Sequence, residues 1–468
     1  MTHHGRGSAG SGRISDGGDR WLLVAVAGLL SFVAMLDMNI VNVALAQISR
    51  DLHLSAATAQ WVVLGYQLPV VALLLPVGRW LDGTGPRSAV LGATVGFAVC
   101  SALAAAAPSA ELLVMARLAQ GLFGAVLFVL MPVLAIGSVR PELRGRAMSV
   151  PATLGPLGAV TGPAIGGLLL DQLGWRSVFL VKIPFCLLAL IVAWKGMPRD
   201  GGLRLPGRRP LWDALLVATG VTVMLVALSL AAGNVSWLAL TVAAVPPLWL
   251  WMRGPGGDPV ATALRAPGLP QAHGAVLSLA AGFAAMHYVI ALHLQRDDGF
   301  SATATGLTVL AFPLGMGLAG PLGGRLADRY GARPVAVAGA AVTSAGLLLL
   351  VPLGGDGAPG DLAWRLALAG VGMGLNGGPT QALVMTAAPR QRTATVGSTI
   401  QLARSLGFTL GPALATAAWG VAGPVHGTRA GLVLAAAAAC LSVSLLALPP
   451  RPTADAAAGT NAASTAPN

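Results

Sequence analysis

The chain contains GRWLDGTGPR at residues 78–87 and GRLADRYGAR at residues 324–333. Both stretches follow the pattern G-R-x-x-D-x-x-G-x-R, and each comes directly after an apolar run. A second pair repeats in the same order, with G-x-x-x-G-P at residues 158–163 and again at residues 407–412. Two repeats in register predict a chain built from two equivalent halves, each with a polar loop of the same kind.

The composition indicates that most of the surface faces lipid. Of the 468 residues, 55% are hydrophobic and only 10% are charged, whereas a soluble domain carries about 25% charged residues. The net charge of +12 comes from basic residues in short clusters between apolar runs, without a basic face, which excludes nucleic acid as a partner. The first apolar run is longer than a signal-peptide core and carries Asp37, so we expect a retained helix.

Fourteen apolar runs have about the length that crosses a bilayer. If the N-terminus is cytoplasmic, most of the 29 Lys and Arg residues fall on the cytoplasmic side. We therefore expect a multi-pass protein of a bacterial cytoplasmic membrane with both termini in the cytoplasm. The predicted spans are 21–47, 60–80, 88–107, 112–136, 147–170, 177–196, 214–232, 236–252, 272–295, 302–324, 335–353, 364–387, 394–420 and 430–448.

The predicted fold is an all-α membrane protein with two six-helix bundles and two additional linker helices. The second motif loop follows the tenth span, so an extra pair of spans separates the halves. The predicted domains are a cytoplasmic polar tail (1–20), an N-terminal six-helix bundle (21–200), a linker with two extra helices (201–265), a C-terminal six-helix bundle (266–450) and a disordered cytoplasmic tail (451–468).

These motifs resemble those of a known family. GRLADRYGAR looks like the signature loop of the major facilitator superfamily, and LDMNIVNVAL at 36–45 resembles the first-helix motif of its fourteen-span drug:proton antiporters. RLAQG at 117–121 resembles their fourth-span motif, and residues 158–167 resemble their fifth-span antiporter motif. The resemblance covers nearly the whole chain. It implies the major facilitator fold and proton-driven efflux of the quaternary ammonium and methylenomycin resistance type.

Asp37 is the one acidic residue well inside a predicted span. An ionised carboxylate near the bilayer midplane is costly, so Asp37 is a candidate proton-coupling residue, with a lasting ion pair to another helix as the alternative. The resemblance implies a coupling role for Arg117, which is the expected partner of Asp37; the alternative is a fixed strut between helices. Gln120, three residues after Arg117, is expected to help position it.

The two motif loops are expected to close the cytoplasmic side. Asp82 and Asp328 occupy the same position in each loop, where carboxylates can cap helix N-termini and pair with arginines of adjacent helices. Such contacts would break when the transporter faces inward, whereas plain topogenic charge is the alternative for the basic residues. The predicted gate consists of Gly78, Arg79, Asp82, Arg87, Gly324, Arg325, Asp328, Arg329 and Arg333.

The fifth span is rich in small residues that let helices approach closely. The resemblance implies a kinked, tightly packed helix that favours exchange over leak, and packing alone is the alternative. The residues concerned are Gly158, Gly162, Pro163, Gly166 and Gly167.

Other polar residues inside spans either line a substrate cavity or bond neighbouring helices: Asn39, Asn42, Tyr66, Gln67, Gln120, Asn376, Gln381 and Gln401. Lys182 and Arg404 are either structural or favour anionic substrates. Since the second half has no embedded carboxylate, we expect divalent cations to be poor substrates. His287 and His293 lie six residues apart and do not suit a metal site. The three cysteines sit in apolar runs, where we expect buried thiols.

Three functions fit this pattern. We favour export of a small amphipathic drug, antibiotic or toxin in exchange for protons. A proton-coupled importer of a nutrient or metabolite would share the fold, since fold alone does not decide direction. A membrane sensor or scaffold fits less well, because both tails are short and polar. Catalytic motifs and nucleotide-binding motifs are absent from the sequence, so we expect neither an enzyme nor a cofactor. We expect the protein to function as a monomer that binds its small-molecule substrate, protons and lipid.

Overall fold

The computed structural model describes residues 19–54, 56–203, 208–231, 235–296, 298–299, 302–352 and 359–448. Within these ranges the chain is helical and contains no strand. Ten described helices are long and apolar enough to cross a membrane. The other four predicted spans also fall on helices, so the prediction of two six-helix bundles with two extra helices is confirmed. The predicted tails lie almost wholly outside the described residues.

The first half begins at α1 and ends at α7. Its last predicted span is interrupted after α6, and Lys182 lies in the break. The helix α4 is the most enclosed of this half, with a face of small and aliphatic side chains against α2 and α3. The helices are α1 (Trp21–Asp51), α2 (Ala56–Asp82), α3 (Pro86–Ala106), α4 (Ala110–Gly137), α5 (Arg144–Leu173), α6 (Arg176–Leu180) and α7 (Ile183–Gly196).

The second half begins at α11. Its last helix, α16, contains both of the last two predicted spans, which are separated by a bend at Gly423. Gly423 has φ of 74°, a conformation that favours glycine. The helices are α11 (Leu269–Arg296), α12 (Ala302–Val309), α13 (Ala311–Tyr330), α14 (Ala332–Leu350), α15 (Pro359–Ala387) and α16 (Thr393–Ala447).

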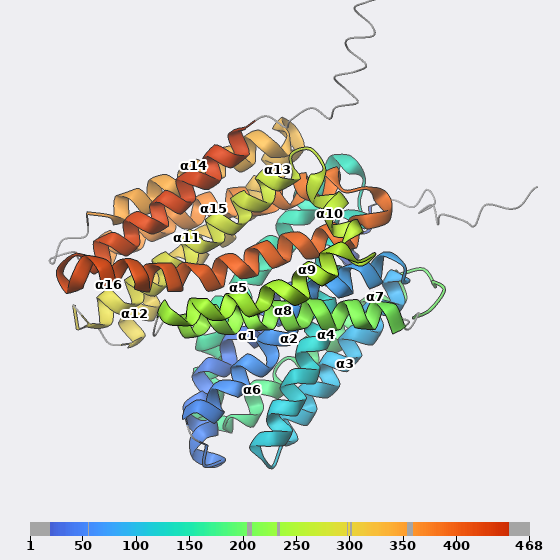
Figure 1. Ribbon diagram of the computed structural model, residues 1–468, viewed down its shortest axis with the longest axis horizontal. Helices are drawn as coiled ribbons and strands as arrows, with labels where there is room; N and C mark the ends of the chain where they lie inside the picture. The colour runs from blue at the N-terminus through green and yellow to red at the C-terminus, as the bar shows by residue number, and fades with distance from the viewer. Residues whose placement is uncertain are drawn as a thin grey trace, which may run out of the picture.

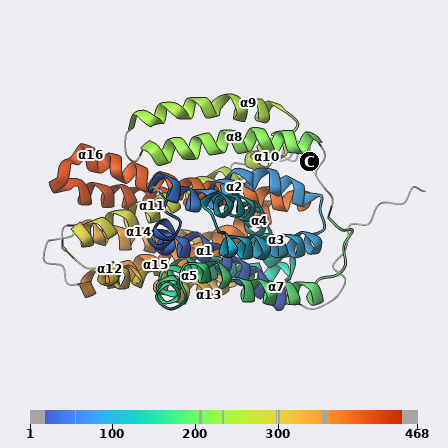
Figure 2. The same cartoon turned by 90° about the horizontal axis from the view of Figure 1, so that it is seen from below.

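The linker forms the two extra helical segments and one short helix. Figure 2 shows α8 and α9 as an outer layer, and α8 packs against both α2 and α16. The extra pair therefore lies beside the junction of the two halves. Its elements are α8 (Arg208–Ala231), the 3-10 helix η2 (Val235–Ala244), α9 (Val245–Arg253) and α10 (Asp258–Arg265).

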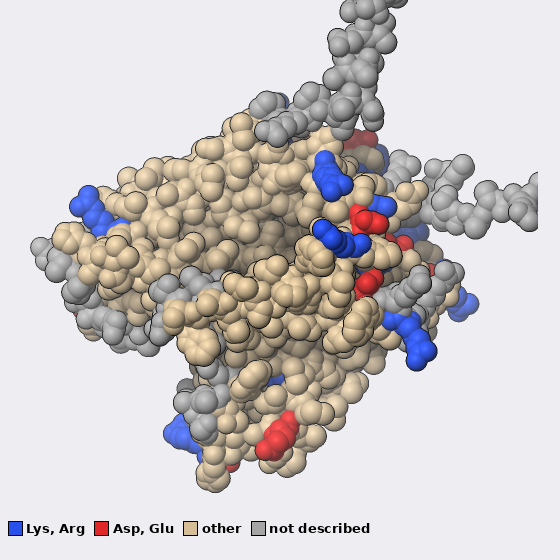
Figure 3. Space-filling model, viewed as in Figure 1, with Lys and Arg blue, Asp and Glu red and all other residues tan. Residues whose placement is uncertain are grey.

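The two halves meet through α5 with α13 and α15, and through α2 and α4 with α16. In Figure 1 the bundles diverge from one end of the molecule, where α7 and α10 lie. Charged side chains gather at this same end in Figure 3, while the body between the ends is largely uncharged. We call it the motif end, because the loops 83–85 and 331 lie there, together with the starts of α5 and α16.

The cysteine prediction is correct for two residues and wrong for one. Cys100 and Cys186 are buried, whereas Cys440 is exposed on α16. An apolar run predicts a membrane helix but does not say which side of it faces lipid, and a thiol is tolerated on either side.

Candidate functional site

Asp37 is the centre of a buried charge cluster that joins α1, α4 and the α6–α7 break. Its carboxylate accepts a hydrogen bond from Arg117 Nη1 at 2.6 Å and forms an ion pair with Lys182 Nζ. The Asp37 and Lys182 side chains have no exposed surface, and that of Arg117 is 1% exposed. The expected pairing of Asp37 with Arg117 is therefore confirmed, and Lys182 is a second cationic partner.

Polar and aromatic neighbours hold these charges in place. Gln120 Oε1 accepts from Arg117 Nη1 at 2.8 Å, while Gln120 Nε2 donates to Asp37 at 3.2 Å and to Ser101 at 3.3 Å. Arg117 Nε donates to the Val62 carbonyl at 3.0 Å. The guanidinium lies 4.6 Å from the centre of the Tyr66 ring, a cation–π distance. Contacts from α4 thus orient Asp37, and contacts from α2 orient Arg117.

The cluster holds two cations and one anion in an enclosed space. Charges buried in this way are tolerated only when they are paired and hydrogen-bonded. Asp37 provides that pairing for both Arg117 and Lys182. A proton on Asp37 would leave the two cations without their counter-ion, so the arrangement is sensitive to the protonation of a single carboxyl group.

A second feature is a pair of equivalent contacts at the motif end. Asp82, at the end of α2, accepts from the backbone N–H groups of Ala394 at 2.9 Å and Thr395 at 3.2 Å, and from the Thr395 hydroxyl. Asp328, on α13, accepts from Gly145 N at 2.9 Å and pairs with Arg146 Nε at 3.1 Å. Each carboxylate caps the first turn of a helix of the opposite half, as the sequence predicted.

The motif glycines let these helices cross closely. A Cβ atom at Gly78 would lie 2.6 Å from Ser398 Cβ on α16. A Cβ atom at Gly324 would lie 2.9 Å from Arg146 Cα on α5. Both distances are shorter than real Cβ contacts. The first residue of each motif therefore has to be glycine for the motif end to close as it does here.

Among the described residues, the motif arginines do not pair with carboxylates of the opposite half. Arg79 pairs with Asp213 of α8 at 3.0 Å, and Arg333 Nε donates to the Leu446 carbonyl at 2.9 Å. Arg325 and Arg329 are exposed. Within the described chain, the arginine that pairs with a motif carboxylate across the halves is Arg146, which lies outside both motif loops and was not among the predicted gate residues.

The first motif loop is also held within its own half. Arg87 Nη2 donates to the Trp194 carbonyl at 3.0 Å. Asp200 accepts hydrogen bonds from the Ser88 backbone N–H at 2.9 Å and from the Ser88 hydroxyl. Partial burial raises the pKa of the Asp200 carboxyl, but the hydrogen bonds from Ser88 and from the backbone of Gly202 and Arg87 together lower the pKa overall. These contacts fix the loop between α2 and α3.

The glycines of α5 face α1, the helix that carries Asp37. A Cβ atom at Gly158 would lie 2.2 Å from the Phe32 carbonyl oxygen, and one at Gly162 would lie 3.2 Å from Ile40 N. A Cβ at Gly166 would lie 2.9 Å from Ile40 Cγ1, whereas a Cβ at Gly167 would meet nothing within 4 Å. Pro163 lies in the unbroken helix α5, but its side chain is outside the described residues.

We expect Gly158→Ala to destabilise the protein by about 1–3 kcal/mol, because the added methyl group overlaps the α1 backbone. The matched control is Gly167→Ala, for which we expect a change within about 0.5 kcal/mol. Thermal unfolding of both purified variants measures the difference. Equal melting temperatures would contradict the close α1–α5 packing.

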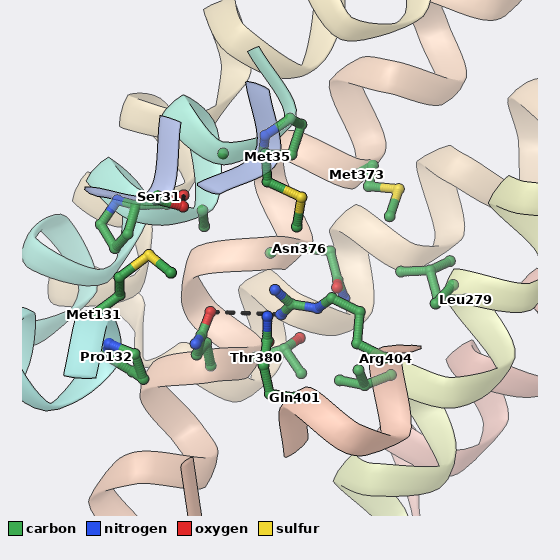
Figure 4. A pocket seen from close by; sticks show the side chains of 18 of the residues that line it. Ser31, Met35, Met131, Pro132, Leu279, Met373, Asn376, Thr380, Gln401 and Arg404 are labelled. Atoms are coloured by element: carbon green, nitrogen blue, oxygen red, sulfur yellow. Dashed lines mark hydrogen bonds between the residues drawn. The ribbon is translucent and has the colours of Figure 1, made fainter. Parts of the chain in front are cut away.

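A central cavity of about 90 Å³ lies between the halves. It is lined from the first half by α1, α4 and α5, and from the second half by α11, α13, α15 and α16. Three of the predicted cavity residues line it: Asn376, Gln381 and Gln401. Figure 4 shows that the Arg404 side chain also extends from α16 into this space.

The other cavity predictions fall elsewhere. Tyr66 and Gln120 belong to the charge cluster, and Gln67 does not line the cavity. Asn39 and Asn42 donate to carbonyls one turn back on their own helix, at 2.9 and 3.4 Å. By helical spacing they continue the α1 face that carries the cavity residues Ser31 and Met35, but they lie beyond the cavity itself.

The histidines are not placed to bind a metal together. His287 packs against Phe283 and Phe312, with ring centres 4.2 and 5.4 Å away, and His293 Nε2 lies 3.7 Å from Asp298. The described part of the chain has no group of three or more potential metal ligands.

A family model described as Major Facilitator Superfamily matches residues 27–284 and 272–467. The chain belongs to this superfamily. Among its relatives, the uncharacterized transporter YebQ of Escherichia coli is 30% identical over 90% of this chain and 94% of its own. The drug efflux pump JefA of Mycobacterium tuberculosis is 32% identical over 85% of this chain and 80% of its own.

Solved structures agree with the fold. The crystal structure of the superfamily transporter FucP in its outward conformation covers 90% of this chain and 97% of its own, with a TM-score of 0.65 and 13% identity. The family model and the curated relatives identify the chain as a membrane transporter of this superfamily. A transport mechanism for this chain has to account for the charge cluster, the paired caps and the central cavity.

Lys182 is the cluster residue whose role the sequence left open. A signal for it was present, because a cation inside a span needs an anion, and Asp37 is the one acidic residue well inside a predicted span. The same signal does not say which of the embedded cations pairs with Asp37, and the structure shows that Lys182 does, whereas Arg404 donates to Gln381.

Proposed function

We propose that this transporter exports small amphipathic compounds from the bacterial cytoplasm in exchange for protons, by alternating access. The observation that carries the proposal is the burial of Asp37 between Arg117 and Lys182. A buried carboxylate that counters two cations is a site where one proton changes the local charge balance. The relative JefA is named as a drug efflux pump, which supports export as the direction.

The proposed coupling starts at α1. A proton on Asp37 leaves Arg117 and Lys182 unpaired, and their repulsion favours a different arrangement of α1, α4 and the α6–α7 break. α1 also carries Ser31 and Met35 of the cavity wall, so a shift of α1 changes the cavity. α5 packs closely on α1 and is capped by Asp328 at its start, which links the same shift to the motif end.

In this proposal the motif end faces the cytoplasm, as the distribution of Lys and Arg predicts. With both caps formed, the exporter is closed to the cytoplasm, and its halves diverge toward the outside. Breaking the caps would open the cavity to substrate from the cytoplasm.

Inverted membrane vesicles test the exchange directly. With the vesicle interior made acidic, we expect uptake of a fluorescent drug into vesicles that contain the protein, and loss of this uptake when a protonophore collapses the gradient. Vesicles without the protein are the control. In intact cells, alkalinisation of the medium on addition of substrate would instead indicate proton-coupled import and would contradict export.

A further inference from the structure

The central cavity contains one charged side chain among the described residues that line it, and that side chain is a cation, Arg404. Among the described residues, its polar contact is a hydrogen bond of 3.4 Å from Arg404 Nη2 to Gln381 Oε1. No acidic side chain in the described ranges lies within ion-pair distance of it. Arg404 is therefore a guanidinium that lines a cavity without an anion of its own.

Asp37 does not provide that anion. Its carboxylate is enclosed by Arg117, Lys182 and Gln120, and it does not line the cavity. The two embedded cations that the sequence could not tell apart, Lys182 and Arg404, thus differ in the structure. Lys182 is paired inside the protein, whereas Arg404 faces the space between the halves.

The rest of the cavity suits an apolar or aromatic molecule with a polar end. Met131, Met316 and Phe408 are among its walls, and thioether and aromatic groups pack well against flat rings. Beside Arg404, the Thr380 hydroxyl and Gln401 Oε1 are buried and have no hydrogen-bond partner among the described residues. Figure 4 shows Thr380 and Gln401 close to the Arg404 side chain.

We infer that Arg404 binds the anionic group of the substrate, and that the exported compounds are amphipathic aromatic acids rather than cations. A guanidinium offers two parallel N–H donors to a carboxylate, and the Thr380 hydroxyl can donate to it as well. This inference rests on the proposed export function, of which it names the substrate class. The cavity of about 90 Å³ holds the acidic end of such a molecule, and a whole drug-sized molecule requires the halves to separate further.

The test compares two dyes that share a xanthene core and differ in charge. Fluorescein carries a carboxylate, and rhodamine 123 is a cation. Binding to the purified full-length protein is measured by fluorescence polarisation without any ion gradient. We expect the wild type to bind fluorescein at least about tenfold more tightly than rhodamine 123, because only the anion can pair with Arg404.

Substitutions then locate the site. We expect Arg404→Gln to weaken fluorescein binding by about tenfold or more, and Arg404→Lys to retain part of it. Arg429→Gln, an exposed arginine of the same helix, is the matched control and should change nothing. Gln381→Glu places a carboxylate beside Arg404, so it should weaken fluorescein binding and strengthen rhodamine 123 binding.

Three results would contradict an anion-binding role for Arg404. A wild type that prefers rhodamine 123, that binds neither dye, or that binds fluorescein equally well after Arg404→Gln would overturn it. The wild-type preference needs no variant, so misfolding of Arg404→Gln cannot hide the answer. Proton-driven uptake of rhodamine 123 alone would refute the anion site and leave proton-coupled export intact. Arg404-dependent fluorescein binding without proton-driven uptake would support the anion site and contradict proton-coupled export.

Discussion

Asp37→Asn will abolish proton-driven uptake into inverted vesicles, with a loss of at least about 100-fold, the factor that corresponds to about 3 kcal/mol of lost pairing. Asparagine cannot take up or release the proton, and it leaves Arg117 and Lys182 without an anion in an enclosed site. Exchange of labelled for unlabelled substrate in the absence of a gradient needs no proton, so we expect this exchange to persist.

Two variants separate coupling from folding. Asp37→Asn combined with Lys182→Met removes one of the unpaired cations, so the double variant should regain stability but not proton-driven uptake. Asp51→Asn, on the same helix, keeps an acceptor for Trp175 Nε1 and should transport normally. If Asp37→Asn alone still accumulates substrate against a pH gradient, Asp37 is a structural ion pair and the proton site lies elsewhere.

Hydropathy and repeated motifs were sufficient to predict the fold. A run of about 20 apolar residues in lipid has to hydrogen-bond its backbone N–H and C=O groups internally, which a helix does. Each apolar run therefore predicts a helix. The paired caps were predictable for a related reason. Asp82 and Asp328 occupy the same position in two copies of one motif, and a carboxylate at that position can cap a helix N-terminus once the halves pack.

The sequence does not predict where along the helices the cavity ends or which of the embedded cations pairs with Asp37. Asn39 lies on the cavity face of α1, as the helical period indicates, but the period does not say where along that face the two halves close. Lys182 and Arg404 look equivalent in sequence, and only the folded chain brings one of them to Asp37 and leaves the other in the cavity. Long-range contacts decide both questions.

The paired caps predict a large shift in conformation when both are removed. Asp82→Asn and Asp328→Asn each lose the charge and one acceptor of a capping carboxylate, which we expect to cost the closed motif end about 1.5 kcal/mol, or about tenfold in population. The two sites contact different helices and share no partner, so their effects should add. The double variant should then favour the open motif end by about 100-fold relative to the wild type.

Distances between spin labels on the two halves measure this shift, with labels at the exposed positions Lys195 and Ala387. We expect one short distance in the wild type, a mixture in each single variant and a longer distance in the double variant. Asp361→Asn is the matched control, because Asp361 pairs with Arg365 of its own helix and not across the halves. An unchanged distance in the double variant would mean that the carboxylates do not hold the halves together. Closure of the motif end would then rest on the close crossings at Gly78 and Gly324 alone.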